Sequence, residues 1–132
     1  MGVSGFERSV DAMTNSTIVQ QFFDSYTRAL LDRDAKAIAE HYAVPALIEF
    51  PEHPIAVSEA SQTEQFFSGA FGQYEAVSTT HATIKVVAET GHSIWADVTW
   101  THDAGVPSEH FIYQLVRDSE SWKIAVLTPL DT

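Results

Sequence analysis

The sequence has 132 residues and contains no cysteine. This absence excludes a disulfide scaffold, a thiolate nucleophile, and any zinc or iron–sulfur site that needs cysteine ligands. Basic residues are also few, because 7 Lys and Arg stand against 18 Asp and Glu, which gives a formal net charge of −11. A surface of this sign repels phosphate backbones and anionic lipids, so we expect neither nucleic acid nor a membrane surface as a partner.

Long hydrophobic runs are missing as well. No apolar run approaches the ~20 residues that a membrane helix needs. The opening stretch MGVSGFERSVDAMTNST lacks the basic and apolar regions of a signal peptide, which predicts a cytoplasmic location. The length and the 45% hydrophobic content suit one globular domain. We expect a flexible N-terminal extension over residues 1–14 and a single domain over residues 15–132.

The first half of the chain has helical periodicity. Apolar side chains recur every three to four residues in three segments that follow capping signals, such as the Thr17 to Gln20 spacing. The predicted helices cover residues 17–32, 34–42 and 61–74. Between the second and third helices, ALIEF at 46–50 predicts a short strand and PEHP at 51–54 predicts a turn.

From Val77 onward the period changes to two. Four strands are predicted, at 77–89, 93–102, 109–117 and 122–128. Short connections favour an antiparallel meander with one apolar face that the helices must cover. The predicted fold class is α+β, with a curved, mostly antiparallel sheet wrapped around three N-terminal helices as a cone-shaped barrel with an internal pocket.

Two segments carry a resemblance to a known superfamily. YTRALLDRDAKAIAEHYAVPALIEFP at 26–51 and FIYQLVRDSESWKIAVL at 111–127 resemble the nuclear-transport-factor-2-like superfamily, which is SnoaL-like and cystatin-like in fold. The resemblance extends over about residues 15–130 and implies a cone with a small-molecule pocket. The superfamily holds enzymes and binding modules, so the fold alone does not give the function.

One group of relatives, the ketosteroid isomerases, aligns with 26–51 without a gap. The resemblance places their oxyanion tyrosine on Tyr26, their general-base aspartate on Phe50, and their second oxyanion donor near Tyr113. A phenylalanine cannot accept a proton, and isomerase chemistry needs a base within reach of the substrate. The alignment therefore implies a pocket at this place without ketosteroid isomerase activity.

Three residues are candidates for catalysis. Tyr26 could donate a hydrogen bond to a ligand carbonyl, or be a core tyrosine bonded to the backbone. His102 has the parity of Trp100 and is a candidate general base. Tyr113 could pair with Tyr26, but its face is ambiguous. The strand 109–117 can bury either Phe111, Tyr113 and Leu115 or His110, Ile112 and Val116.

Carboxylates offer weaker candidates. Glu49 would be the best base if it lay inside, yet its parity opposes that of its inward neighbours. A paired-carboxylate mechanism by Asp97 and Glu109 is disfavoured because Asp97 has outward parity. The predicted pocket lining is Glu49, Phe50, Phe67, Phe71, Val98 and Trp100.

Cofactor motifs are absent from the sequence. No two histidines have HxH or HExxH spacing, so we predict no metal site. No glycine-rich phosphate loop or nucleophile elbow occurs, so no nucleotide cofactor or Ser-His-Asp triad is indicated.

These residues support two classes of function. The first is a cofactor-independent isomerase, dehydratase or cyclase that acts by acid–base chemistry on a small apolar substrate. The second is a non-catalytic ligand-binding or dimerisation module. The expected partners are a small organic ligand and a second copy of the chain, through the outer sheet face that carries Trp95, Val87 and Thr99.

Overall fold

The computed structural model describes residues 2–130, with helices early in the chain and most strands late. The elements are α1 (Gly2–Leu31), α2 (Ala35–Ala39), β1 (Tyr42–Phe50), β2 (His53–Val57), α3 (Ala60–Ala70), the 3₁₀ helix η1 (Phe71–Tyr74), β3 (Thr80–Glu89), β4 (Ser93–His102), β5 (Glu109–Asp118) and β6 (Ser121–Pro129). This order confirms the predicted α+β class.

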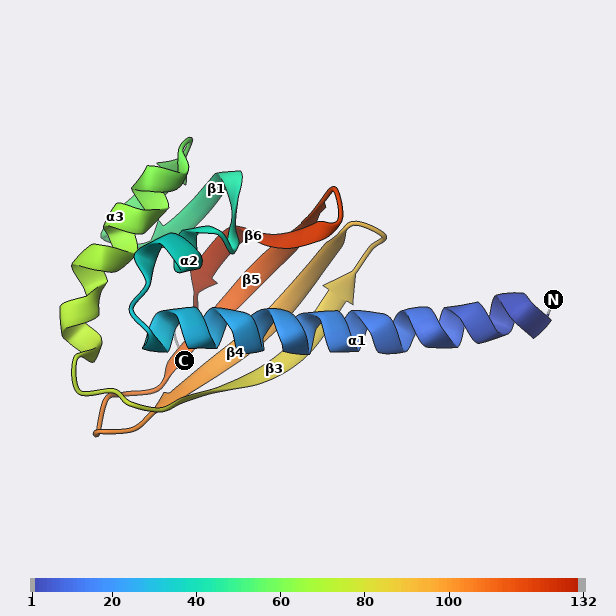
Figure 1. Cartoon of the computed structure of the whole chain (residues 1–132), viewed down its shortest axis with the longest axis horizontal. Coiled ribbons are helices and arrows are strands. Elements are labelled where there is room, and N and C mark those ends of the chain that lie inside the picture. Colours follow the sequence, from blue (N-terminus) through green and yellow to red (C-terminus); the bar gives the residue numbers. More distant parts are fainter. Residues whose placement is uncertain (1, 131–132) are drawn as a thin grey trace.

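All six strands form one curved, mixed sheet in the order β2-β1-β6-β5-β4-β3 (Figure 1). Strands β3 to β6 are the predicted antiparallel meander. Strand β1 pairs with β6 in parallel and with β2 in antiparallel orientation. Because β2 and β3 are the two edges, the sheet stays open and does not close into the predicted barrel.

Helix α1 crosses the inner face of this sheet, and its N-terminal part extends past the strands (Figure 1). Val19, Phe23 and Tyr26 repeat at helical spacing and are buried against the sheet. On β4, the alternate residues Ile94, Ala96, Val98 and Trp100 are all buried, as the period of two predicted.

The starts of two helices differ from the prediction. Helix α1 begins at Gly2, so Thr17 lies within the helix and does not cap it. Helix α3 begins at Ala60 because its capping box uses Glu59 and Gln62. There, Gln62 Oε1 accepts a hydrogen bond from the Glu59 N–H at 2.9 Å. Within residues 2–130, no helix combines the length and the apolar character needed to cross a membrane.

The strands also differ from the prediction in three places. β1 begins at Tyr42, which was expected to be helical, and an irregular register between Tyr42 and Leu47 accommodates Pro45. The expected 51–54 turn is reduced to residues 51–52, because β2 begins at His53. Pro54 is tolerated in β2 because β2 is an edge strand. On β3, a register shift between Val86 and Ala88 leaves the outer end of this strand exposed rather than buried.

Candidate functional site

A cavity of about 580 Å³ lies between the helices and the inner face of the sheet. Side chains from α1, α3, η1 and all six strands contribute to its wall. The aromatic lining residues are Tyr26, Phe50, Phe66, Phe67, Phe71, Tyr74, Trp100, Phe111 and Tyr113. A concave, mostly apolar space with a few polar groups is typical of a small-molecule site.

Most of the residues predicted for the site line this cavity. They are Tyr26, Phe50, Phe67, Phe71, Trp100, His102 and Tyr113. Val98 is fully buried in the core and is not part of the wall. Glu49 is exposed, and its Oε2 accepts a hydrogen bond from Thr128 Oγ1 at 3.0 Å. Because Ile48 is buried on the inner face, alternation along β1 turns Glu49 outward.

His102 and Glu109 form a hydrogen-bonded pair in the cavity wall. His102 Nε2 lies 2.9 Å from Glu109 Oε1, and His102 Nδ1 lies 2.6 Å from Thr80 Oγ1. A carboxylate only accepts hydrogen bonds, so Nε2 donates to Glu109, while Nδ1 and the Thr80 hydroxyl form the second hydrogen bond of the ring. Tyr74 donates to the second carboxylate oxygen, Oε2, at 2.8 Å.

Sequence reasoning considered Glu109 only as a partner of Asp97 and set the pair aside because Asp97 faces outward, so Glu109 was not predicted as a pocket residue in its own right. The structure buries Tyr113 and Leu115, and alternation then brings Phe111 and Glu109 to the same inner face. Asp97 lies on the outer face, as its parity predicted, where its Oδ1 is 2.7 Å from His110 Nε2. The two strand carboxylates therefore do not share a site.

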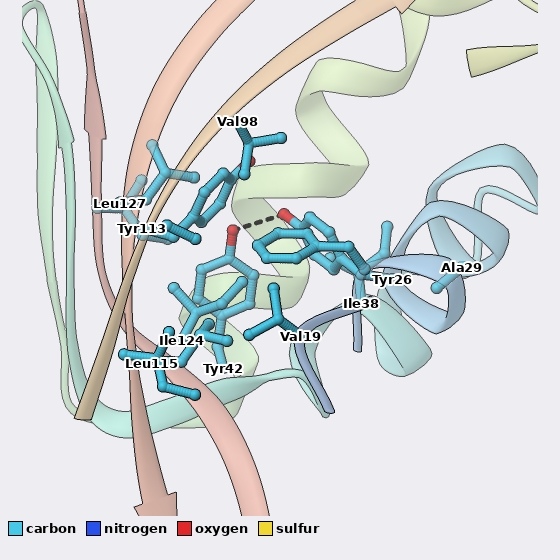
Figure 2. Close-up of a cluster of buried hydrophobic side chains, with 14 of the residues drawn as sticks. Val19, Tyr26, Ala29, Ile38, Tyr42, Val98, Tyr113, Leu115, Ile124 and Leu127 are labelled. Carbon is cyan, nitrogen blue, oxygen red and sulfur yellow. Dashed lines mark hydrogen bonds between the residues drawn. The ribbon is translucent and has the colours of Figure 1, made fainter. Parts of the chain in front are cut away.

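Buried hydroxyl groups form a second polar region, in which Tyr26 and Tyr113 line the cavity and Tyr42 lies in the core beside it. The hydroxyls of Tyr26 and Tyr42 lie 2.6 Å apart (Figure 2). Trp100 Nε1 donates to the Tyr113 hydroxyl at 2.9 Å. Burial is the main cause that raises the pKa of Tyr26, Tyr42 and Tyr113 well above the ordinary value. All three phenols stay protonated at neutral pH, so they can donate hydrogen bonds.

Arg33 holds the segment that carries Tyr74 in place through hydrogen bonds to backbone carbonyls. Its guanidinium donates to the backbone carbonyls of Leu31 at 2.7 Å, Tyr74 at 2.5 Å and Val77 at 3.0 Å. These bonds join the turn after α1 to η1 and to the segment before β3. Arg33 also lines the cavity, but a contact across 41 positions of sequence leaves no periodic signal that could have revealed it.

A metal site needs several histidine or acidic side chains that lie close together. Among the side chains that the structure describes, those of residues 16–130, no three His, Asp or Glu gather closely enough to hold an ion. The polar groups of the cavity are two carboxylates (Glu52 and Glu109), two imidazoles (His53 and His102), a guanidinium, a carboxamide and several hydroxyls. Such a set is suited to proton transfer and hydrogen bonding.

Solved structures place this architecture among the NTF2-like and cystatin-like folds. An NTF2-like protein of unknown function from Shewanella oneidensis has a TM-score of 0.73 and 12% identity, covering 89% of this chain and 99% of its own. A protein provisionally named scytalone dehydratase from Novosphingobium aromaticivorans has a TM-score of 0.74 and 10% identity, covering 94% and 88%. A cystatin-like protein of unknown function from Nostoc punctiforme has a TM-score of 0.72 and 12% identity, covering 90% and 78%.

Identities this low establish the fold only. The family is established by sequence, because residues 14–132 match the family described as NTF2-like protein (DUF6841). The chain belongs to this family, which confirms the resemblance stated from the segments 26–51 and 111–127. No curated protein matches the chain significantly.

Proposed function

We propose that this chain binds a small neutral organic molecule in the cavity and catalyses a cofactor-independent proton transfer. The reaction would be an isomerisation, dehydration or cyclisation of a carbonyl compound. The observation that supports this most is the pair His102–Glu109 in the wall of a largely aromatic cavity. A carboxylate held by fixed donors next to an apolar space is an arrangement that suits a general base.

Each polar group has a proposed role. Glu109 takes the proton, while His102 and Tyr74 hold its two oxygens in place. Tyr26 or Tyr113 donates a hydrogen bond to the substrate oxygen on which negative charge develops. Glu109 and Tyr113 are four residues apart on one strand face, which is about 13 Å at about 3.3 Å per residue. A conjugated ketone, in which the oxygen and the acidic carbon are well separated, suits this spacing.

Hydrogen–deuterium exchange into ketones tests the proposal without knowledge of the natural substrate. A panel of small aryl ketones and enones is incubated with the chain in D₂O, and NMR follows deuteration of the carbon next to the carbonyl and of the γ carbon of each enone. We expect acceleration by the wild type and a loss of about 100-fold or more in Glu109→Gln, because removal of a general base has effects of this size. Glu120→Gln, an exposed carboxylate in the β5–β6 turn, is the matched control and should behave as wild type.

A second candidate function has its own supporting observation. The hydroxyls of Tyr26 and Tyr42 already satisfy each other at 2.6 Å, as a structural pair would. Such a cavity could serve a non-catalytic binding module. Binding can be followed by the saturable quenching of tryptophan fluorescence by ketones. If ketones bind in this assay but the chain accelerates the deuteration of none of them, this function is favoured over catalysis.

We further propose that the chain acts as a cytoplasmic homodimer. Trp95, Ile112 and Val126 lie on the outer face of the sheet, opposite the cavity, and are only half-buried in the protomer. A two-fold contact would cover this apolar strip on both copies at once.

A further inference from the structure

A second, shallower groove of about 390 Å³ lies on the outside of α1, away from the cavity. One helix face supplies Ile18, Gln21, Phe22 and Ser25, which are spaced by three or four residues. The turn after α2 and the start of β6 supply His41, Trp122 and Lys123. None of these residues lines the larger cavity.

The imidazole of His41 is held firmly in this groove. Its Nδ1 lies 2.8 Å from the Ala37 carbonyl oxygen, which can only accept, so Nδ1 carries the proton. The ring packs edge-on against Phe22, with centroids 5.3 Å apart, and in a tilted orientation against Tyr26 at 5.6 Å. The His41 carbonyl also accepts the Ile124 N–H at 2.8 Å, which ties the turn to β6.

The second nitrogen of the ring faces a hydroxyl. Ser25 Oγ lies 2.9 Å from His41 Nε2, and Ser25 itself is exposed. Since Nε2 has no proton in this tautomer, Ser25 is the donor. Burial lowers the pKa of His41, and the nearby Lys123 ammonium lowers it further, whereas the Ala37 carbonyl and Glu40 oppose the shift. The ring is therefore neutral at pH 7 and free to take a proton.

We propose that Ser25 and His41 are a nucleophile and its base, and that this groove is a site of acyl transfer from small neutral esters. Ser25 Oγ bonds to the acyl carbon while the ester C–O bond breaks. His41 Nε2 takes the serine proton and gives it to the departing oxygen. Water then hydrolyses the acyl-serine, which releases the carboxylic acid and restores both side chains.

The surroundings of the pair define the class of substrate. Gln21 carries an amide N–H₂, and Lys123 carries an ammonium that donates to the Glu40 carbonyl with one of its three hydrogens. These groups can stabilise negative charge on the acyl oxygen. Phe22 and Trp122 offer apolar surface to a short acyl or aryl group. The net charge of −11 disfavours anionic esters.

Acylation by p-nitrophenyl acetate tests this proposal. The full chain is mixed with the ester at pH 7.5, p-nitrophenolate release is followed, and the modified residue is located by peptide mass spectrometry. We expect one acetyl group on Ser25 and a matching burst of p-nitrophenolate. Ser25→Ala should abolish both, and His41→Gln should slow the burst by about 100-fold or more, because the amide can accept the hydrogen bond but cannot act as the base.

Ser68→Ala, which removes an exposed serine from α3, is the matched control and should leave the burst unchanged. Acetylation confined to lysines, or Ser25 acetylation at the same rate in His41→Gln, would overturn the proposal. If thermal unfolding shows either groove variant to be unfolded, wild-type chain is treated with phenylmethylsulfonyl fluoride instead. A sulfonylated Ser25 then supports the site, and an unmodified Ser25 refutes it.

Discussion

At the scale of single residues, the Tyr26–Tyr42 pair shows how burial fixes a side chain. Each phenol is almost completely buried and each hydroxyl has the other at 2.6 Å. Tyr26→Phe or Tyr42→Phe alone leaves one buried hydroxyl without this partner, so we expect each change to lower the free energy of unfolding by about 1–3 kcal/mol.

The double variant Tyr26→Phe/Tyr42→Phe removes both hydroxyls and leaves no orphan in this pair. Its loss should therefore be smaller than the sum of the two single losses, by about 0.5–3 kcal/mol, as groups in direct contact show. Urea unfolding of the four proteins measures this difference. Strict additivity would show that the pair contributes nothing as a pair.

Whether a side chain faces inward or outward was predictable where the strand had one clear alternation of apolar and polar residues. On β4 the alternation placed Trp100 and His102 on the inner face, and both line the cavity. Glu109 was considered only together with Asp97 and was not placed in the pocket, and because β5 is apolar on both faces, only the packing of Tyr113 on α1 decides which side is inside. The roles of Tyr26, His102 and Tyr113 stay predictions, since no ligand is yet known.

At the scale of elements, Arg33 joins the turn after α1 to η1 and to the segment before β3. Arg33→Met removes the charged donor from the carbonyls of Leu31, Tyr74 and Val77. We expect a loss of about 2 kcal/mol in the free energy of unfolding, in line with hydrogen bonds to charged groups. Backbone amides of residues 71–80 should exchange faster with deuterium, and those of β4–β6 much less so. Uniform exchange across the sheet would contradict this local role.

A second connection between elements depends on pH. Asp103 accepts hydrogen bonds from the Ser78 hydroxyl at 2.5 Å and the Ser78 N–H at 2.9 Å, which joins the β4–β5 loop to the segment before β3. These bonds lower the pKa of Asp103 from 3.8 to about 2. Because the folded pKa is depressed, the stabilisation is fully present above pH 4 and is lost as the pH falls toward 2.

The comparison of wild type with Asp103→Asn isolates this contribution. The difference between their unfolding midpoints should be constant above about pH 4 and shrink between pH 4 and pH 2. Asp118→Asn, at the exposed end of β5, is the control for a carboxylate outside this connection. A difference that stays constant down to pH 2 would contradict the assigned cause.

Elements with a strong period were predicted in kind, and their boundaries were not. The helical pattern of α1 is interpretable only from Thr17 onward, yet the helix begins at Gly2, so the capping-box spacing was accidental. β2 was missed because Pro54 and Pro51 suggested a turn. Its pairing with β1 depends on tertiary contacts that local propensity cannot show.

At the scale of the whole molecule, charge opposes the proposed dimer. Each copy carries a net charge of −11, so association must overcome repulsion that dissolved salt screens over about 10 Å at 0.1 M. We expect light scattering at micromolar concentration to give twice the 14.6 kDa of one chain. The dimer fraction should rise as salt is added at low ionic strength.

The outer face can be tested by one added charge that a two-fold contact duplicates. Ile112 lies beside Asp97 on the sheet, so Ile112→Glu would put two further carboxylates into an already acidic contact and should give a monomer. Gln65→Glu makes the same charge change on an exposed position of α3 and should stay dimeric. A monomeric wild type would exclude the dimer. A dimeric Ile112→Glu would exclude this face as the contact between the two copies. The sheet that forms one wall of the cavity would then have no second chain packed on its outer side.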